Sequence, residues 1–145
     1  MPQSYERAVE LYKLSAAQGH AIATYNLGSC HYSGRGVDQS FAEARRLYEL
    51  AVARGQTQDA PHLLQGLKDH IQQYCPLLGQ RVVLSGLNTA ALNGTRGTAV
   101  DFGFSEQYPE TGNWVVASGR YTVRLDGAEG RLVKVRAANV GYQRW

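Results

Sequence analysis

Apolar side chains recur three and four residues apart through the first half of the chain. One stripe at this helical spacing consists of Phe41, Ala44, Leu47, Tyr48, Ala51 and Val52. Ser40 followed by Glu43 forms a capping box, which specifies where this helix starts. Gly19 and Gly55 stand where a left-handed residue would end a helix. The pattern therefore predicts helices whose ends are set by their own sequence.

Two further helices are predicted on either side of this stripe. One runs from about Ala21 to Ser33 and stops at Gly34-Arg35-Gly36, and another runs from Asp59, a good N-cap residue, to Tyr74. Beyond them, Cys75-Pro76 is a plausible domain junction, because proline blocks helix continuation and restricts the residue before it. We therefore expect about four helices in residues 1–75 and a different domain in residues 76–145.

The first half also repeats itself at an offset of 36 residues. The offset aligns Ser4 with Ser40, Tyr12 with Tyr48 and Gly19 with Gly55. A period in this range is typical of a helical solenoid, in which small residues let helices approach and larger apolar ones fill the seams.

Several of these positions carry a resemblance to a known family. Leu27-Gly28, Tyr32 and Gly34-x-Gly36-Val37, followed by Ala44-x-x-Leu47-Tyr48, resemble the Sel-one-like repeat, a relative of the tetratricopeptide repeat, over roughly residues 1–60. The resemblance implies a curved array of helices that serves as a scaffold or adaptor and has no catalytic role. It also implies that Tyr25, Asn26 and Ser29 lie on the helix type that lines the concave surface, where they either contact a partner or form a solvated face.

The first repeat unit is incomplete, since Met1 stands where Val37 stands in the next unit. Solenoids usually need about three repeats and a polar cap to be stable. Either the chain is part of a longer repeat protein, which we favour, or another domain or a second copy covers the open face.

Beyond Pro76 the sequence alternates in the manner of β-strands. The runs Gln80–Leu84 and Thr98–Phe102 are predicted strands, and Arg120–Asp126 with Arg131–Arg136 is a predicted hairpin closed by a three-residue loop. The expected register pairs Leu125 with Val133 and Val123 with Val135, and it sets Arg124 beside Lys134 on the outer face. Like charges placed so close repel each other unless an anion or an acidic partner sits between them.

Residues 79–141 resemble a Src-homology-three-like small barrel, a variant that we associate with multidomain proteins of unicellular algae and other protists. The resemblance rests on Leu92-Asn93-Gly94-x-Arg96-Gly97, on Gly119-Arg120-Tyr121 and the residues up to Gly127, and on Ala138-Asn139-Val140. It implies five strands, with a short helical turn at Ala137–Val140 before the last one. Such barrels are also similar to KOW-type nucleic-acid modules. The segment 105–118 is an insertion in which Tyr108 and Trp114 either bind a partner or pack.

Charge divides unevenly between the two halves. Residues 1–75 carry seven Lys/Arg and seven Asp/Glu, so the net charge of +3 lies in residues 76–145. Such an excess weakly favours an acidic or nucleic-acid partner, although solubility alone often explains it. Arg124, Lys134 and Arg136 are the candidate anion-binding strip, with a solvated charged face as the alternative.

No catalytic, cofactor or metal motif is present in the sequence. The four histidines (His20, His31, His62 and His70) are scattered, and neither Cys30-His31 nor Asp69-His70 points its two side chains the same way on a helix. Two distant cysteines, Cys30 and Cys75, indicate reduced thiols, so we expect an intracellular and cytoplasmic protein. No apolar run is long enough for a membrane span, and a signal-peptide pattern is missing.

Together these patterns predict a protein of the α+β class with two segregated domains, an N-terminal α-solenoid and a C-terminal five-stranded β-barrel. The expected function is a non-enzymatic scaffold or adaptor that binds a protein or peptide along the helical groove, with the barrel as a second binding module. The alternative is nucleic-acid binding by the basic barrel, which predicts a steep loss of affinity with salt. The candidate partner-binding residues are Tyr25, Asn26 and Ser29 in the groove and Tyr108, Trp114, Arg124, Lys134 and Arg136 in the barrel.

Overall fold

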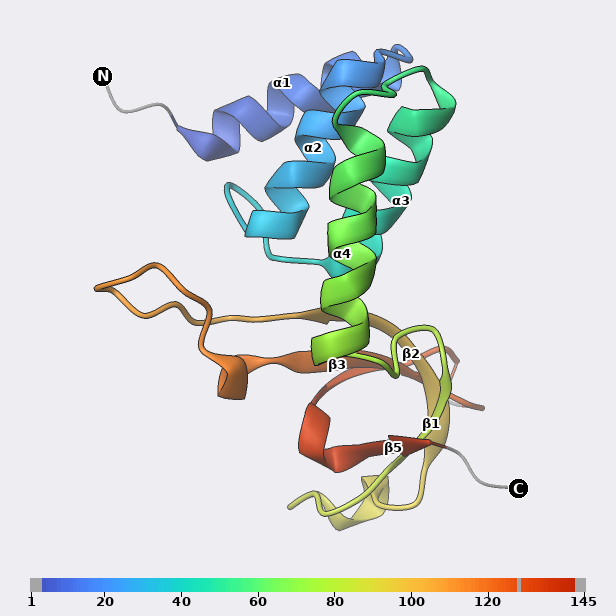
Figure 1. Cartoon of the computed structure of the whole chain (residues 1–145). Helices are drawn as coiled ribbons and strands as arrows, with labels where there is room; N and C mark the ends of the chain where they lie inside the picture. Colours follow the sequence, from blue (N-terminus) through green and yellow to red (C-terminus); the bar gives the residue numbers. More distant parts are fainter. Residues whose placement is uncertain (1–3, 128, 143–145) are drawn as a thin grey trace. The chain divides into compact units, whose positions relative to one another are not determined.

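A computed structural model describes residues 4–127 and 129–142 of the chain (Figure 1). The chain divides between Tyr74 and Cys75 into two compact units, the first helical and the second built on one β-sheet. The predicted α+β class with helices and strands in separate regions is confirmed.

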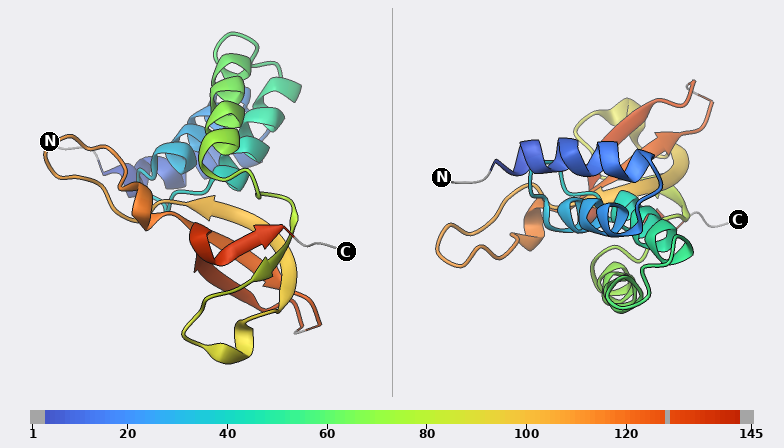
Figure 2. Two further views of the ribbon diagram at one scale, coloured as in Figure 1. Left: turned by 60° about the horizontal axis from the view of Figure 1, so that its bottom comes forward. Right: turned by 90° about the horizontal axis from the view of Figure 1, so that it is seen from above.

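The helical unit consists of α1 (Tyr5–Ala17), α2 (Ala21–Ser33), α3 (Phe41–Ala53) and α4 (Ala60–Tyr74). Each helix packs against the one that follows it in the chain, and the predicted span of α2 is confirmed. The glycines expected to end helices do so in the left-handed region, with φ of +89° at Gly19, +70° at Gly34 and +105° at Gly55. The successive helices are visible in two further directions in Figure 2.

The start of α3 follows half of the predicted capping box. Ser40 Oγ accepts a hydrogen bond of 3.1 Å from the backbone N–H of Glu43. The Ser40 N–H donates to the carbonyl of His31 at 3.0 Å. Glu43 accepts from Arg46 at 3.0 Å, and this hydrogen bond lowers the pKa of the Glu43 carboxyl although partial burial opposes it.

The start of α4 is capped by a residue that the sequence analysis did not select. The Asp59 carbonyl accepts the first helical hydrogen bond from Leu63, as an N-cap residue should. However, the side chain that satisfies the free amides is Gln56, whose Oε1 accepts from the N–H groups of Gln58, Asp59 and Ala60 at 3.0–3.2 Å.

The repeat seen in the sequence has unequal packing in its two copies. In α3, Leu47 and Tyr48 are buried, and they pack against Gly28 of α2. Their counterparts on α1 are Leu11, which is 58% exposed, and Tyr12, which is half-buried. The face of α1 that corresponds to the α2-facing side of α3 is therefore open.

At the other end of the array, α4 is amphipathic and buries Ala60, Leu67 and Ile71. Its exposed positions are Pro61, His62, Gln65, Lys68, Asp69, His70, Gln72 and Gln73, of which all but Pro61 are polar. A polar outer surface of this kind is what a terminal helix of a solenoid needs.

The second unit is a five-stranded antiparallel sheet in the order β4-β3-β2-β1-β5. Its strands are β1 (Arg81–Leu84), β2 (Arg96–Gly103), β3 (Arg120–Leu125), β4 (Leu132–Arg136) and β5 (Val140–Tyr142). The predicted strand number is confirmed, but the predicted closure into a barrel is wrong. The strands β4 and β5 stand at opposite edges of the described sheet, and β5 is only three residues long and pairs with β1 alone.

The hairpin of β3 and β4 exists, but its predicted register is wrong by two residues. Val123 pairs with Val133 rather than Val135, and Arg124 pairs with Leu132. The connection is longer than the three residues expected, because Leu125 and Leu132 are the last and first strand residues on either side of it. As a result Arg120, not Arg124, lies opposite a basic side chain.

A short 3₁₀ turn, η3 (Ala137–Asn139), precedes β5 where the helical turn was expected. The core of the sheet unit contains Phe102 and Tyr121, whose ring centroids are 5.0 Å apart. The Tyr121 hydroxyl accepts a hydrogen bond of 3.1 Å from the N–H of Leu77 and so ties β3 to the segment after Cys75.

Candidate functional site

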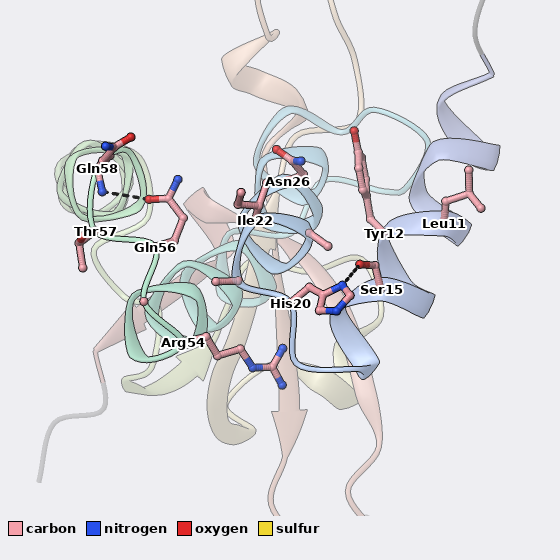
Figure 3. A pocket seen from close by; sticks show the side chains of 13 residues that line it. Leu11, Tyr12, Ser15, His20, Ile22, Asn26, Arg54, Gln56, Thr57 and Gln58 are labelled. Carbon is pink, nitrogen blue, oxygen red and sulfur yellow. Dashed lines mark hydrogen bonds between the residues drawn. The ribbon is translucent and has the colours of Figure 1, made fainter.

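The helical unit has a groove between α1, the first half of α2 and the loop that joins α3 to α4. We call it the helical groove; it has a volume of about 860 Å³. Figure 3 shows Leu11, Tyr12 and Ser15 of α1 on one side, Ile22 and Asn26 of α2 in the middle, and Gln56, Thr57 and Gln58 across from them.

Two aliphatic side chains give the helical groove an exposed apolar surface. Ile22 is 67% exposed and Leu11 is 58% exposed. Single exposed apolar residues are ordinary, but two in one groove provide a surface that an apolar partner side chain would cover.

Polar side chains at the rim are held in place by hydrogen bonds within the unit. Arg54 donates from Nη1 to the carbonyl of Ala16 at 2.7 Å and to Thr24 Oγ1 at 2.8 Å. Ser15 Oγ and His20 Nδ1 lie 2.7 Å apart in a second hydrogen bond. The fixed rim would lose little conformational freedom when a ligand binds, which favours recognition.

The three helical residues predicted to contact a partner do not act together. Asn26 lines the helical groove, as expected. Tyr25 and Ser29 face α3 instead: the ring of Tyr25 lies 5.8 Å from that of Tyr48, and Ser29 Oγ is 2.9 Å from the Tyr48 hydroxyl. Both therefore contribute to the α2–α3 contact.

The groove residues that were not predicted from the sequence include Leu11, Ile22, Arg54 and Gln56. A usable signal existed only for Leu11, whose counterpart Leu47 in the next repeat unit belongs to an apolar stripe. Arg54 and Gln56 follow α3 in a loop, where periodicity carries no information.

In the sheet unit the predicted residues also fall into separate places. Tyr108 is 51% exposed in the inserted segment, which is folded back by a bridge between Gln107 and Trp114. Trp114 is half-buried and stacks on Phe104, with ring centroids 6.1 Å apart. Packing thus accounts for Trp114, and Tyr108 has a free surface.

The basic residues of the hairpin lie on one face of the sheet. Arg120, Thr122 and Arg124 alternate with the buried Tyr121, Val123 and Leu125 along β3. Lys134 and Arg136 pair with Thr122 and Arg120 and so occupy the same face. Arg81 lies on this face as well, and it forms a bidentate ion pair with Asp126 that raises the pKa of Arg81 and lowers that of Asp126.

The histidines and cysteines provide no chemical centre among residues 4–127 and 129–142, where no group of three or more His, Cys, Asp or Glu side chains could hold a metal ion. His70 stacks on Tyr32 with ring centroids 5.6 Å apart, and its Nδ1 is hydrogen-bonded to the Tyr32 hydroxyl. Neither Cys30 nor Cys75 forms a disulfide bond, and burial raises the pKa of the Cys30 thiol although Arg35 opposes the shift. Within the same described ranges, none of the helices is sufficiently long and apolar to span a membrane.

The fold and the groove define a helical-repeat unit joined to a small antiparallel sheet. The helical part matches the Sel1 repeat family model, at residues 1–20 and 21–56. Sel1 repeats are generally protein–protein interaction modules and are typically non-enzymatic. No curated protein and no solved structure matches the chain significantly.

Proposed function

We propose that this chain is a non-enzymatic interaction module whose helical groove binds a segment of a partner protein. The observation that carries the proposal is the pair of exposed side chains Leu11 and Ile22, which face one groove that has a fixed polar rim. An apolar side chain of the partner would cover this pair. Asn26 and Gln56 would then offer hydrogen bonds to the partner backbone.

The proposal extends to the sheet unit as a second binding module with the topology of a Src-homology-three-like domain. Three features support that assignment: the strand order, the irregularity in β2 between Ala99 and Asp101, and the η3 turn before β5. Two weak sites on one chain would reinforce each other through their effective concentration.

Nucleic-acid binding is the second candidate function, and the basic face of β3 and β4 favours it. Under this alternative the affinity for an oligonucleotide would fall steeply as salt rises, because counterion release dominates such binding. The intracellular location expected from the sequence also remains part of the proposal.

The experiment is a selection of peptides from a displayed random library on the full chain, followed by fluorescence-polarisation measurements of affinity. Leu11→Glu and Ile22→Glu should each weaken the selected peptides by about tenfold or more, since a charge would enter the apolar part of the groove. Leu14→Glu is the matched control, because Leu14 is 64% exposed on α1 but does not line the helical groove. Equal affinity for all three variants would refute the proposal.

A further inference from the structure

The sheet unit has a groove between the hairpin and the segment that follows β1. Its basic part, about 550 Å³ in volume, is lined by Arg120, Lys134 and Arg136 of the hairpin and by Asn88 and Asn139. Its apolar part, about 290 Å³, is lined by Leu87, Leu92 and Val133. Asn88 and Lys134 line both parts, and we call the whole the basic groove.

The positive charges of the basic groove stand close together and repel each other, which lowers the stability of the folded chain when no ligand is bound. Arg120 and Arg136 are directly opposite each other in the β3–β4 register, and Lys134 pairs with Thr122 in the adjacent row. Like charges directly opposite across two strands destabilise a sheet. Among the residues that the structure describes, no Asp or Glu lines either part of the groove.

Arg81 lies on the same sheet but, unlike the cations of the basic groove, has an acidic partner that neutralises its charge. Arg81 has Asp126 as its ion-pair partner, whereas Lys134 and Arg136 form no ion pair with residues 4–127 or 129–142. Arg120 donates from Nη1 to the carbonyls of Ala117 and Gly119, which fix its guanidinium without supplying negative charge. An anion between the two arginines would remove the repulsion and accept hydrogen bonds from both.

The wall opposite the hairpin is held in shape by two asparagines. Asn93 accepts a hydrogen bond of 2.8 Å from the Leu87 N–H and donates one of 3.0 Å to the Leu87 carbonyl. Asn139 donates from Nδ2 to the carbonyl of Ser85 at 2.8 Å. The basic groove is therefore formed before any ligand arrives.

We infer that the basic groove binds an acidic peptide segment in which a Glu or Asp stands beside an aliphatic residue. The carboxylate lies between Arg120 and Arg136, and the aliphatic side chain enters the apolar part at Leu87, Leu92 and Val133. The inference rests on the proposed function, because the segment belongs to a protein partner.

Two features favour a peptide over a nucleic acid. Within residues 4–127 and 129–142, no aromatic ring lines either part of the basic groove, so these residues offer bases no surface on which to stack. In addition, β4 is an edge strand whose far side has no strand partner in the described sheet, and an extended peptide can pair with such an edge.

The test uses the full ¹⁵N-labelled chain and a synthetic peptide of the form Gly-Glu-Leu-Glu-Gly, with affinities obtained from amide chemical-shift titrations. Gly-Gln-Leu-Gln-Gly and Gly-Glu-Ala-Glu-Gly are the control peptides, and each should bind about fivefold or more weakly than the acidic leucine peptide. Circular dichroism checks that each variant of the chain is folded. The absence of binding by the acidic leucine peptide at millimolar concentration would overturn the inference.

Variants of the chain show whether the peptide binds to specific residues of the groove or is attracted only by the net positive charge of the unit. Arg136→Gln and Arg120→Gln should each weaken the acidic peptide by about tenfold, and Arg136→Gln is the cleaner variant because the Arg120 guanidinium also donates to the carbonyls of Ala117 and Gly119. Arg131→Gln removes an equal charge from an exposed loop residue outside the groove and should change the affinity less than about twofold. An equal loss in all three variants would mean attraction by net charge alone and would overturn the inference.

Two further arms separate this inference from the proposed function and from the nucleic-acid alternative. Leu11→Glu alters the helical groove alone, so it should leave the shifts caused by the acidic peptide unchanged even if the helical groove binds nothing. A twelve-nucleotide oligothymidylate should bind more weakly than the peptide. Its affinity should stay the same when Leu87 is replaced by alanine, because it has no aliphatic side chain to place in the apolar part of the groove. Tighter oligonucleotide binding that Arg136→Gln abolishes would replace the peptide with a nucleic acid.

Discussion

Gly28 of α2 lies against the ring of Tyr48 in α3, so closely that a Cβ added at Gly28 would stand 2.9 Å from Cδ1 of Tyr48 and 3.2 Å from Cβ of Leu47. Tyr48 and Leu47 are buried, so neither can move aside into solvent. The absence of a side chain at Gly28 is therefore a requirement of the α2–α3 contact, the contact that α1 lacks on its open face.

Gly28→Ala should lower the free energy of unfolding by about 1–3 kcal/mol, because the added methyl overpacks this contact. The matched control is Gly66→Ala in α4, where an added Cβ meets nothing within 4 Å. That control should raise the stability by up to about 1 kcal/mol through helix propensity. Urea unfolding followed by circular dichroism measures both, and equal effects of the two substitutions would contradict the packing argument.

The Ser29–Tyr48 hydrogen bond of 2.9 Å should have a measurable effect on stability. Ser29→Ala leaves the hydroxyl of the buried Tyr48 without this partner, and we expect a loss of about 1–3 kcal/mol. Adding Tyr48→Phe removes the unsatisfied hydroxyl and should recover part of the loss. If the double variant were less stable than Ser29→Ala by about a further 1–3 kcal/mol, the Tyr48 hydroxyl would have a second hydrogen-bond partner.

The hydroxyl groups of Tyr48 and Tyr121 should ionise at a higher pH than a tyrosine in water. Burial raises the pKa of Tyr48 and that of Tyr121 to about 12, although the hydrogen bonds with Ser29 and with the Leu77 N–H act in the opposite direction. Because the folded pKa exceeds the unfolded value near 10, the stability from each group is complete below pH 10. It is lost as the pH rises from 10 towards 12.

Each of these tyrosines should lower the stability of its unit by about 1.4 kcal/mol per pH unit in that window. Urea unfolding at pH 9, 10 and 11 tests the slope, and absorbance at 295 nm reports the ionisation of the nine tyrosines. A single titration step near pH 10 that includes all of them would show that neither hydroxyl is shielded.

Gln56→Ala should destabilise the start of α4, because Gln56 Oε1 accepts from three backbone amides there. We expect a cost of about 1 kcal/mol, the usual value of an N-terminal cap. Asp59→Ala is the comparison, and it should cost less, because the Asp59 side chain has only a 3.5 Å hydrogen bond with Gln56. A larger loss of stability for Asp59→Ala than for Gln56→Ala would mean that Asp59 is the capping residue, as the sequence suggests.

The helices were predictable because their signals are local. Ser40, Gly34 and Gly55 act on residues within one turn of themselves, and the observed α2 and α3 ends agree with them. The hairpin register was not predictable in the same way, since Val123 has similar partners at Val133 and Val135 and the loop length decides between them. Because of this two-residue error, the pairing of Arg120 with Arg136 could not be predicted.

The candidate sites were predictable only in part, for a related reason. Asn26 was named from the resemblance to the repeat family, Lys134 from the outer face of the predicted hairpin, and Arg136 from its nearness to that face in sequence. The helical groove also needs Arg54 and Gln56, which a loop brings beside α1 and α2. Side chains gathered from a loop and two helices leave no periodic trace in a single sequence.

The most direct test of the central claim is the mapping of a selected peptide on the full chain by amide chemical shifts. We expect that, at saturation, the largest shifts in the helical unit fall on Leu11, Ile22, Asn26 and the segment 54–58, which line one groove. Shifts confined to the outer side of α4, or absent from the helical unit altogether, would contradict it.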